Sequence, residues 1–261
     1  MRRTRSAQPD RPIVAVTDSD LYARGMTTVA ACWAAFARSA TGAHVHHFPH
    51  LAVAVFPDEP ERSIYNNSIL ERGLAPAERA AALEAMEELY AAAGVSRFAA
   101  WVHETDRAMQ EELRRRGYTV DTTTRAMGLS LDSVSLPRPD IELAAPEWRE
   151  HLRIIGVASD LLSGLDQTAL HLLVAQHAGE NVATAFGFDH GEDCGIYNVV
   201  TLEHARRRGI GIALTATLVR GAVARGCATA SLQATPMAEL MYASVGFRHL
   251  GRIIEYVPTR R

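Results

Sequence analysis

The chain has 261 residues, of which 48% are hydrophobic and 22% are charged, and its net charge is -3. This composition is typical of a globular protein, and no apolar run approaches the roughly 20 residues of a membrane span, which argues against a membrane protein. The small negative charge gives no electrostatic reason to expect nucleic acid or an anionic membrane as a partner, so we expect a small molecule or another protein.

Residues 1–12 are basic and polar and lack the apolar run of a secretory signal. We therefore expect a disordered leader, with the cytoplasm as the default location. The sequence contains no lysine, which excludes a lysine Schiff base and a P-loop lysine. Three distant cysteines lie in no metal-binding spacing and are expected to be buried thiols: Cys32, Cys194 and Cys227.

Four histidines occur close together near the start of the first half. They have no acidic or cysteine partner at a fitting spacing, so we expect solvent-exposed side chains and no metal site. These histidines are His44, His46, His47 and His50.

Hydrophobic periodicity and Gly/Pro punctuation then predict two strands, a helix stopped by Gly94, a strand, a helix and a strand. Asp106 is suited to cap the second of these helices. The predicted ranges are strands 51–56 and 63–69, helix 76–93, strand 97–103, helix 106–116 and strand 125–131.

Residues 132–140 are rich in Ser, Pro and Asp and are predicted to be a linker. After it we expect a strand, a helix, three strands joined by tight turns as an antiparallel meander, and then a helix, a strand, a helix and a last strand pair. The predicted ranges are strand 141–143, helix 146–162, strands 170–176, 182–188 and 194–201, a helix from 206–211 to Gly226, strand 228–234, helix 236–244 and strands within 249–257.

This order predicts an α/β (α+β) fold. The second part of the order of elements in the C-terminal half also occurs in the N-terminal half. This repeat favours two tandem modules, 13–134 and 135–261, over the alternative of one long domain.

The segment Arg206-Arg207-Arg208-Gly209-Ile210-Gly211 follows an apolar strand and opens a helix. The backbone N–H groups from Arg207 to Ile212 would be free to point at one spot, and with the helix dipole they would form a pyrophosphate site. Glycine lets a phosphate approach the backbone, and the arginines add positive charge. The alternative is that both glycines only relieve crowding at a strand-to-helix junction.

The stretch from Val199 to Thr215 resembles the acetyl-CoA motif of the GNAT N-acetyltransferases. Residues 235–247 resemble the second GNAT signature, in which Tyr242 is followed four residues later by Gly246 and Phe247. The detailed match covers about residues 170–257, and in the first half only the order of elements agrees. The resemblance implies a GNAT-like mixed, mostly antiparallel sheet flanked by helices, with acetyl-CoA or another acyl-CoA as co-substrate and no metal.

By this resemblance, the pantetheine arm of CoA pairs with the main chain of one strand and its pyrophosphate rests on the following loop. The implied cofactor-binding residues are Val199, Thr201, Arg206, Arg207, Arg208, Gly209, Ile210, Gly211 and Ile212. Tyr242 is similar to the tyrosine that protonates the leaving thiolate, the alternative being a packed aromatic residue on an amphipathic helix.

Where some family members carry a glutamate, this chain has Gly195. Strand alternation places Asp193 and Tyr197 on the same face as Gly195, so either could accept the proton of the attacking amine, directly or through water. Asp193 could equally be an exposed turn residue, and Glu255 is a further candidate. No Cys or Ser has the setting of a nucleophile, so we expect direct transfer in a ternary complex.

In the first half, the loop at the corresponding place lacks the second glycine, and its Glu71 and Glu78 would repel a pyrophosphate. We expect no second CoA site, and we expect this module to help form the acceptor pocket. The candidate substrate-binding residues are Asn66, Trp101 and His103, each with an alternative role as a turn former or cap.

The sequence thus predicts an N-acyltransferase, active as a monomer or homodimer, that acts on a primary amine of a small molecule or peptide. A non-catalytic acyl-CoA sensor and a binding protein with a purely structural glycine loop are the alternatives.

Overall fold

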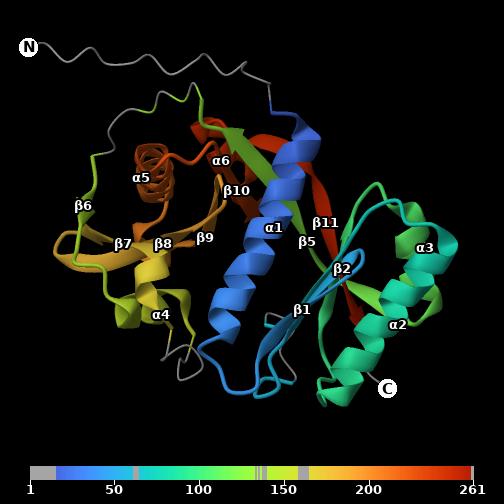
Figure 1. Cartoon of the computed structure of the whole chain (residues 1–261). Coiled ribbons are helices and arrows are strands. Elements are labelled where there is room, and N and C mark those ends of the chain that lie inside the picture. The colour runs from blue at the N-terminus through green and yellow to red at the C-terminus, as the bar shows by residue number, and fades with distance from the viewer. Residues whose placement is uncertain are drawn as a thin grey trace, which may run out of the picture.

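The structure is a computed structural model that describes residues 16–60, 65–132, 134, 136, 140–157 and 165–259. The predicted leader at residues 1–12 lies outside these residues, as does much of the predicted linker. The described chain contains both helices and strands, and the helices cover both faces of one sheet (Figure 1).

The first half contains α1 (Asp18–Ala37), β1 (His44–Phe48), β2 (Leu51–Val55), β3 (Asn67–Leu70), α2 (Pro76–Ala92), β4 (Ala99–His103), α3 (Arg107–Arg115) and β5 (Tyr118–Ser130). The second half contains β6 (Glu142–Leu143), α4 (Trp148–Ile155), the short helix η1 (Gln167–Ala169), β7 (Leu170–His177), β8 (Glu180–His190), β9 (Asp193–Thr201), the short helix η2 (Glu203–Ala205), α5 (Ile210–Arg225), β10 (Thr229–Ala234), α6 (Glu239–Val245) and β11 (Arg248–Pro258).

The described strands form one sheet with the order β1-β2-β3-β4-β11-β5-β10-β9-β8-β7-β6. Neighbouring strands are antiparallel except for two parallel pairs, β3 with β4 and β9 with β10. The predicted class, a mixed and mostly antiparallel sheet flanked by helices, is confirmed, as is the meander of β7, β8 and β9.

The last strand of each half lies in the sheet of the other half. β5 of the first half pairs with β10, and β11 of the second half pairs with β4. β5 and β11 also pair with each other, so they join the two halves at the centre (Figure 1). The order of elements repeats as predicted, but the sheet runs without a break across the predicted module boundary.

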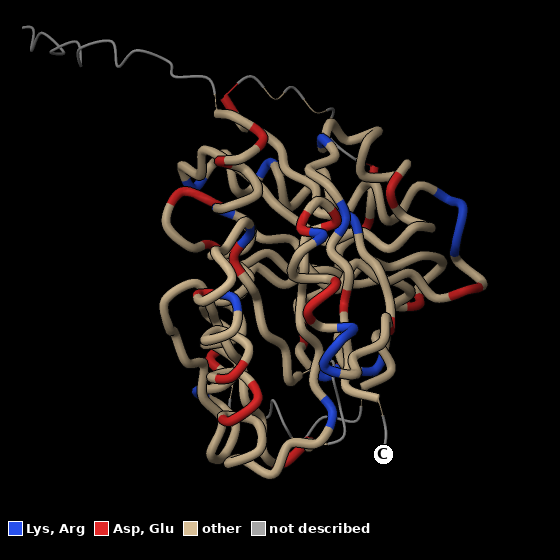
Figure 2. The backbone as a smooth tube through the Cα atoms, turned by 90° about the vertical axis from the view of Figure 1, so that its right-hand side faces the viewer, with Lys and Arg blue, Asp and Glu red and all other residues tan. Residues whose placement is uncertain are grey.

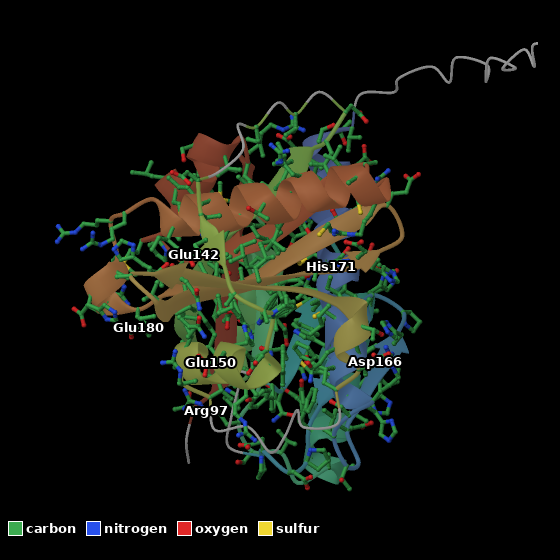
Figure 3. The ribbon with its side chains drawn as sticks, turned by 90° about the vertical axis from the view of Figure 1, so that its left-hand side faces the viewer. Arg97, Glu142, Glu150, Asp166, His171 and Glu180 are labelled. Atoms are coloured by element: carbon green, nitrogen blue, oxygen red, sulfur yellow. The ribbon has the colours of Figure 1, made fainter. Side chains whose placement is uncertain are left out.

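Strand alternation assigns the helices to two faces. On β5, Ala126 packs against α1, whereas Met127 and Leu129 face the core under α5 and α6. Helices α2 and α3 cover the core that contains Tyr256 of β11, on the same face as α5 and α6. Helix α4 packs with α1 on the opposite face. Figure 3 shows α5 on one side of the strands and α4, with Glu150, on the other.

Helix α1 crosses the middle of its face and contacts strands of both halves. Thr17 and Asp20 form a capping box at its start. Gly25 allows close packing, because a Cβ at that position would lie 2.9 Å from the Cβ of Ser231. Neither this helix nor β1 was predicted from the sequence, since the buried residues of α1 lie on several sides and leave no single apolar stripe.

Several predicted boundaries are wrong. Strand β5 begins at Tyr118, seven residues before the predicted 125. Helix α4 ends at Ile155, before the predicted 162, because Gly156 adopts a left-handed conformation (φ 73°) that ends the helix, and residues 158–162 lie outside the described ranges. Helix α6 begins at Glu239, three residues later than predicted. The predicted last strand pair is the single strand β11, in which Gly251 (φ 109°) lies at a bulge between His249 and Arg252.

Candidate functional site

The sheet opens into a wedge between β9 and β10. The two strands pair in parallel at only three positions, from Asp193 to Gly195 on β9 and from Thr229 to Ser231 on β10. Beyond Gly195, the edge of β9 that faces β10 has no strand partner within the described chain. Val199 and Thr201 therefore lie on an open strand edge, which is a surface that an extended ligand can pair with.

The loop after β9 offers free backbone donors. Arg207 and Gly209 have positive φ angles, 61° and 78°, on either side of Arg208. The first amide of α5 with an internal acceptor is Ala213, which donates to the carbonyl of Gly209 at 2.9 Å. The amides of residues 207–212 donate to no atom of the described chain. Such a series of amides at a helix N-terminus forms an anion-binding concavity.

The two glycines of this loop have different roles. At Gly209 a Cβ would meet no atom within 4 Å, so the left-handed backbone accounts for this glycine. At Gly211 a Cβ would lie 2.9 Å from the sulfur of Met241 and 3.9 Å from Val199, so a side chain here would have to displace the end of Met241. The contact brings α6 and β9 against the first turn of α5. The crowding alternative therefore applies to Gly211 and not to Gly209.

The arginines beside the loop are exposed. Arg206 donates from its Nε to the carbonyl of Thr201 at 3.1 Å, which fixes the loop to the end of β9. The structure thus brings together all the residues from which a cofactor site was predicted, from Val199 to Ile212.

Tyr242 lies on α6 and is 6% exposed. It packs in the core under α5, with its ring 6.1 Å from that of Phe247. Burial raises the pKa of its phenol to about 12. Its hydroxyl makes no hydrogen bond to any residue that the structure describes, so this hydroxyl is available to a ligand.

Asp193 is 2% exposed and lies at the apex of the wedge, so the alternative of an exposed turn residue is wrong. Its two carboxylate oxygens accept hydrogen bonds from the hydroxyls of Thr229 at 2.7 Å and Ser231 at 2.6 Å. The carboxylate therefore ties β9 to β10 at the last positions where the strands pair.

Tyr197 explains why residue 195 is glycine. A Cβ at position 195 would collide with the Tyr197 hydroxyl, so the phenol occupies the space of a side chain at that position. The hydroxyl is buried and has no hydrogen-bond partner among the residues that the structure describes. Burial, followed by nearby Cys32 and Asp193, raises the pKa of Tyr197 well above its ordinary value.

The corresponding loop of the first half has its amides occupied. The amide of Gly73 donates to a carboxylate oxygen of Asp106 at 3.0 Å, and that of Ala75 donates to Glu78 at 2.9 Å. The amide of Glu71 donates to the carbonyl of His50 at 3.0 Å. Two carboxylates of the protein therefore take the amides that a phosphate would need.

The three predicted substrate-binding residues are used in internal hydrogen bonds. The Asn66 side chain accepts from the Phe56 amide and donates to the Glu59 carbonyl, and the Trp101 indole N–H donates to Asn67 at 3.1 Å. The His103 ring bonds to the carbonyl of Leu250 and to Thr105. A role in acceptor binding stays a prediction for all three.

Sequence reasoning missed His151, a fully buried residue of α4. Its Nδ1 lies 2.8 Å from the hydroxyl of Thr184, and its Nε2 has no partner within the described ranges. Burial lowers the pKa of this histidine to about 4. A single histidine on a helix face gives no sequence signal that could have singled it out.

A separate cleft of about 850 Å³ lies along α1, between that helix, the ends of β2 and β3, and Phe188. It contains His47 and His50, and His50 pairs with Glu71 at 2.6 Å, which raises the pKa of this histidine. No group of three or more His, Cys, Asp or Glu side chains within the described ranges is arranged to hold a metal ion. No residue from Val199 to Ile212 lines this cleft.

Acidic and basic residues are interspersed over the backbone, with no uniformly basic face in this view (Figure 2). None of the helices in the described part of the chain is both long and apolar enough to cross a membrane.

Residues 168–249 match the family model described as Acetyltransferase (GNAT) domain, and this range contains the wedge, the loop and Tyr242. Among curated proteins none matches the chain. Residues 168–249 of the second half therefore carry a GNAT acetyltransferase domain, as the two motifs implied.

Solved structures share the fold over nearly the whole chain. A GCN5-related N-acetyltransferase from Kribbella flavida is 19% identical, with a TM-score of 0.68 over 91% of this chain and 96% of its own. One from Sphaerobacter thermophilus is 17% identical, with a TM-score of 0.59 over 92% and 93%. A tandem GNAT protein from the clavulanic acid biosynthesis pathway is 12% identical, with a TM-score of 0.54 over 80% and 79%. At these identities the likeness establishes the fold alone.

Proposed function

We propose that the chain is an acetyl-CoA-dependent N-acyltransferase that moves an acetyl or other acyl group from CoA to a primary amine of a small molecule or peptide. The observation that carries this proposal is the series of amides from Arg207 to Ile212, which have no acceptor within the described chain. They lie where the open edge of β9 meets the N-terminus of α5. A pyrophosphate there would receive several charge-assisted hydrogen bonds.

CoA would supply the activated acyl group as a thioester. The open edge of β9 at Val199 and Thr201 would hold its pantetheine arm, and the loop with Arg206 to Arg208 would hold its phosphates. In the transfer, the amine nitrogen forms the new N–C bond while the C–S bond breaks. The thiolate then takes up one proton, and the amine loses one.

Tyr242 is the proposed donor to the leaving thiolate. A phenol with a pKa near 12 stays protonated at neutral pH and can direct its hydrogen at the developing negative charge. Its hydroxyl has no competing internal acceptor among the described residues, which supports this role.

Asp193 and Tyr197 are the proposed route for the amine proton. Asp193 is 2% exposed and its oxygens accept hydrogen bonds from Thr229 and Ser231, so the proposed path to this carboxylate runs through water or through the Tyr197 hydroxyl, which has no hydrogen-bond partner among the described residues. Position 195 itself cannot supply a base, because the phenol of Tyr197 fills its space.

We assign catalysis to residues 135–261 and a supporting role to residues 13–134. Asp106 and Glu78 occupy the amides of the first-half loop, which supports one CoA per chain. Asn66, Trp101 and His103 remain the proposed contribution of this module to the acceptor side.

The test is thiol release from acetyl-CoA with a panel of primary amines, together with mass spectrometry of the products. Amine-dependent thiol release and an acetylated product are expected. The glycine at position 195 favours one competitor, a non-catalytic acyl-CoA sensor. That protein would bind acetyl-CoA but release no thiol with any amine.

A further inference from the structure

The cleft along α1 is a candidate for a second binding site. This α1 cleft has a volume of about 850 Å³ and is lined by one face of α1, the tip of the β1–β2 hairpin, the end of β3 and two residues of β8. Its volume falls within the range of about 300–1,000 Å³ that small-molecule sites occupy. Among the residues that the structure describes, none from the wedge or from the loop before α5 lines it. The proposed CoA site therefore does not account for this cleft.

Much of the lining of the α1 cleft is apolar. The residues that α1 contributes include four alanines, whose short side chains leave room above the helix: Ala23, Ala30, Ala31 and Ala34. Leu51 of β2, Ile69 of β3 and Phe188 of β8 bring apolar surface to the cleft from three strands. Such a lining can cover the hydrocarbon or aromatic body of a ligand.

Arg72 gives the cleft a positive charge that no carboxylate of the described chain neutralises. Its guanidinium carbon lies 4.5 Å from the centroid of the Tyr22 ring, and both residues line the cleft. This arginine forms no hydrogen bond or ion pair with any residue in the part of the chain that the structure describes. The ring supports the planar guanidinium while its N–H groups stay free, an arrangement that suits bidentate binding of a carboxylate.

The acidic residue next to Arg72 is bonded elsewhere. Glu71 accepts a hydrogen bond from Nδ1 of His50 at 2.6 Å, and this contact raises the pKa of the histidine and favours its charged form. Arg38, the C-cap residue of α1, adds a second guanidinium to the lining. The charges of the lining therefore favour an anion. Glu71 would oppose the second negative charge of a phosphate monoester, which favours a carboxylate.

We propose that the α1 cleft binds an organic carboxylate with an apolar body, such as a medium-chain fatty acid. Arg72 donates two N–H groups to the carboxylate beside the ring of Tyr22, and the alanine face of α1 together with Phe188 covers the body. The cleft runs where α1 passes the β1–β2 hairpin (Figure 1). This site is separate from the proposed acyl transfer, and its test requires no acetyl-CoA.

Calorimetry with octanoate, 1-octanol and octyl phosphate tests the head group. The three compounds carry the same eight-carbon chain, so differences in affinity report on the head group alone. We expect the wild type to bind octanoate more tightly than 1-octanol by about tenfold or more, and more tightly than octyl phosphate. Equal binding of octanoate and 1-octanol, tighter binding of octyl phosphate, or no binding of any of the three overturns the proposal.

Substitutions at exposed positions then locate the site. Arg72→Gln removes the charge, and Thr27→Trp places a large side chain on the part of α1 that lines the cleft. Arg107→Gln changes an exposed arginine of α3 outside the cleft and serves as the matched control.

We expect Arg72→Gln to weaken octanoate binding by about tenfold or more and to leave 1-octanol binding unchanged. Thr27→Trp should weaken the binding of both compounds, and Arg107→Gln should bind them as the wild type does. Melting temperatures without ligand verify that each variant is folded. Unchanged octanoate affinity in either cleft variant overturns the proposal, and the proposed acyl transfer then still stands.

Discussion

At the scale of single residues, Tyr242 links packing to chemistry. Replacing it with Phe keeps the ring in the core beside Phe247 and removes only the hydroxyl. We expect Tyr242→Phe to lower kcat by about 100-fold, with the KM for acetyl-CoA nearly unchanged, because the donor acts on the thiolate that forms in the transition state. Steady-state kinetics measure both quantities. Unaltered turnover would reduce Tyr242 to a packing residue.

Glu255 should make stability depend on pH. Burial raises its pKa from 4.5 to about 7 in the folded protein, so the folded state holds this proton more tightly than the unfolded chain. Its stabilising contribution is complete below the unfolded pKa and is lost as pH rises through about 7, at most about 3 kcal/mol. Urea unfolding should show that, from about pH 5 to about pH 8, the free energy of unfolding of Glu255→Gln rises relative to that of the wild type. Parallel pH curves would contradict this assignment.

Sequence reasoning identified the glycine at position 195 but not what fills its space. The absence of a glutamate there is visible in a single sequence, whereas the return of the Tyr197 phenol over the strand is a packing result. Asp193 illustrates the same limit. Its burial depends on α1, a helix that the sequence analysis did not assign, and so its exposure could not be judged.

At the scale of elements, the two loops that precede α2 and α5 differ in whether their backbone amides donate hydrogen bonds within the protein. The arginine and glycine pattern was sufficient to predict the free donors before α5. The first-half loop was predicted not to bind a pyrophosphate because Glu71 and Glu78 would repel it. The structure adds that Asp106 and Glu78 accept hydrogen bonds from this loop.

Asp106 should therefore stabilise two elements at once. One oxygen caps α3 by accepting from the Met109 amide at 3.0 Å, and the other accepts from Gly73. We expect Asp106→Ala to lower the free energy of unfolding by about 1–2 kcal/mol, and Asp106→Asn to lower it less, because an amide oxygen can still cap the helix. Thermal denaturation followed by circular dichroism measures the difference. Equal stability of Asp106→Ala and the wild type would show that neither bond matters.

Elements with a clear apolar period or firm stop signals could be predicted, among them α2, α5 and the meander of β7 to β9. The last strand was predicted as a strand pair, whereas it is one strand with a bulge at Gly251. Helix α4 was predicted to continue to residue 162, past the glycine at position 156 that ends it. In both cases the local sequence is compatible with more than one structure, and tertiary contacts determine where the element ends.

At the scale of the whole molecule, the exchange of β5 and β11 makes each half depend on the other. Strand partners that lie 99 or more residues apart in the sequence leave no local pattern, so the tandem order was predictable and the exchange was not. Without β5, strand β10 would lose its neighbour at the centre of the sheet. Without β11, strand β4 would lose its neighbour there. Exposed edges of this kind are prone to aggregation.

Fragments 1–134 and 135–261 should therefore fail to fold alone and should form a native-like complex when refolded together. Amide spectra of each fragment and of the mixture measure this directly. A cooperative thermal transition in either isolated fragment would contradict the interdependence of the halves.

The central claim is that the loop from Arg207 to Ile212 binds the CoA pyrophosphate. Acetyl-CoA should raise the melting temperature of the wild type, and the matched variants Gly209→Glu and Gly73→Glu test the site. Both glycines have positive φ, 78° and 75°, and open space around a Cβ, so the two substitutions carry similar backbone strain. We predict that Gly209→Glu abolishes the shift and that Gly73→Glu retains it. No shift in the wild type, or an equal shift in both variants, would contradict the account.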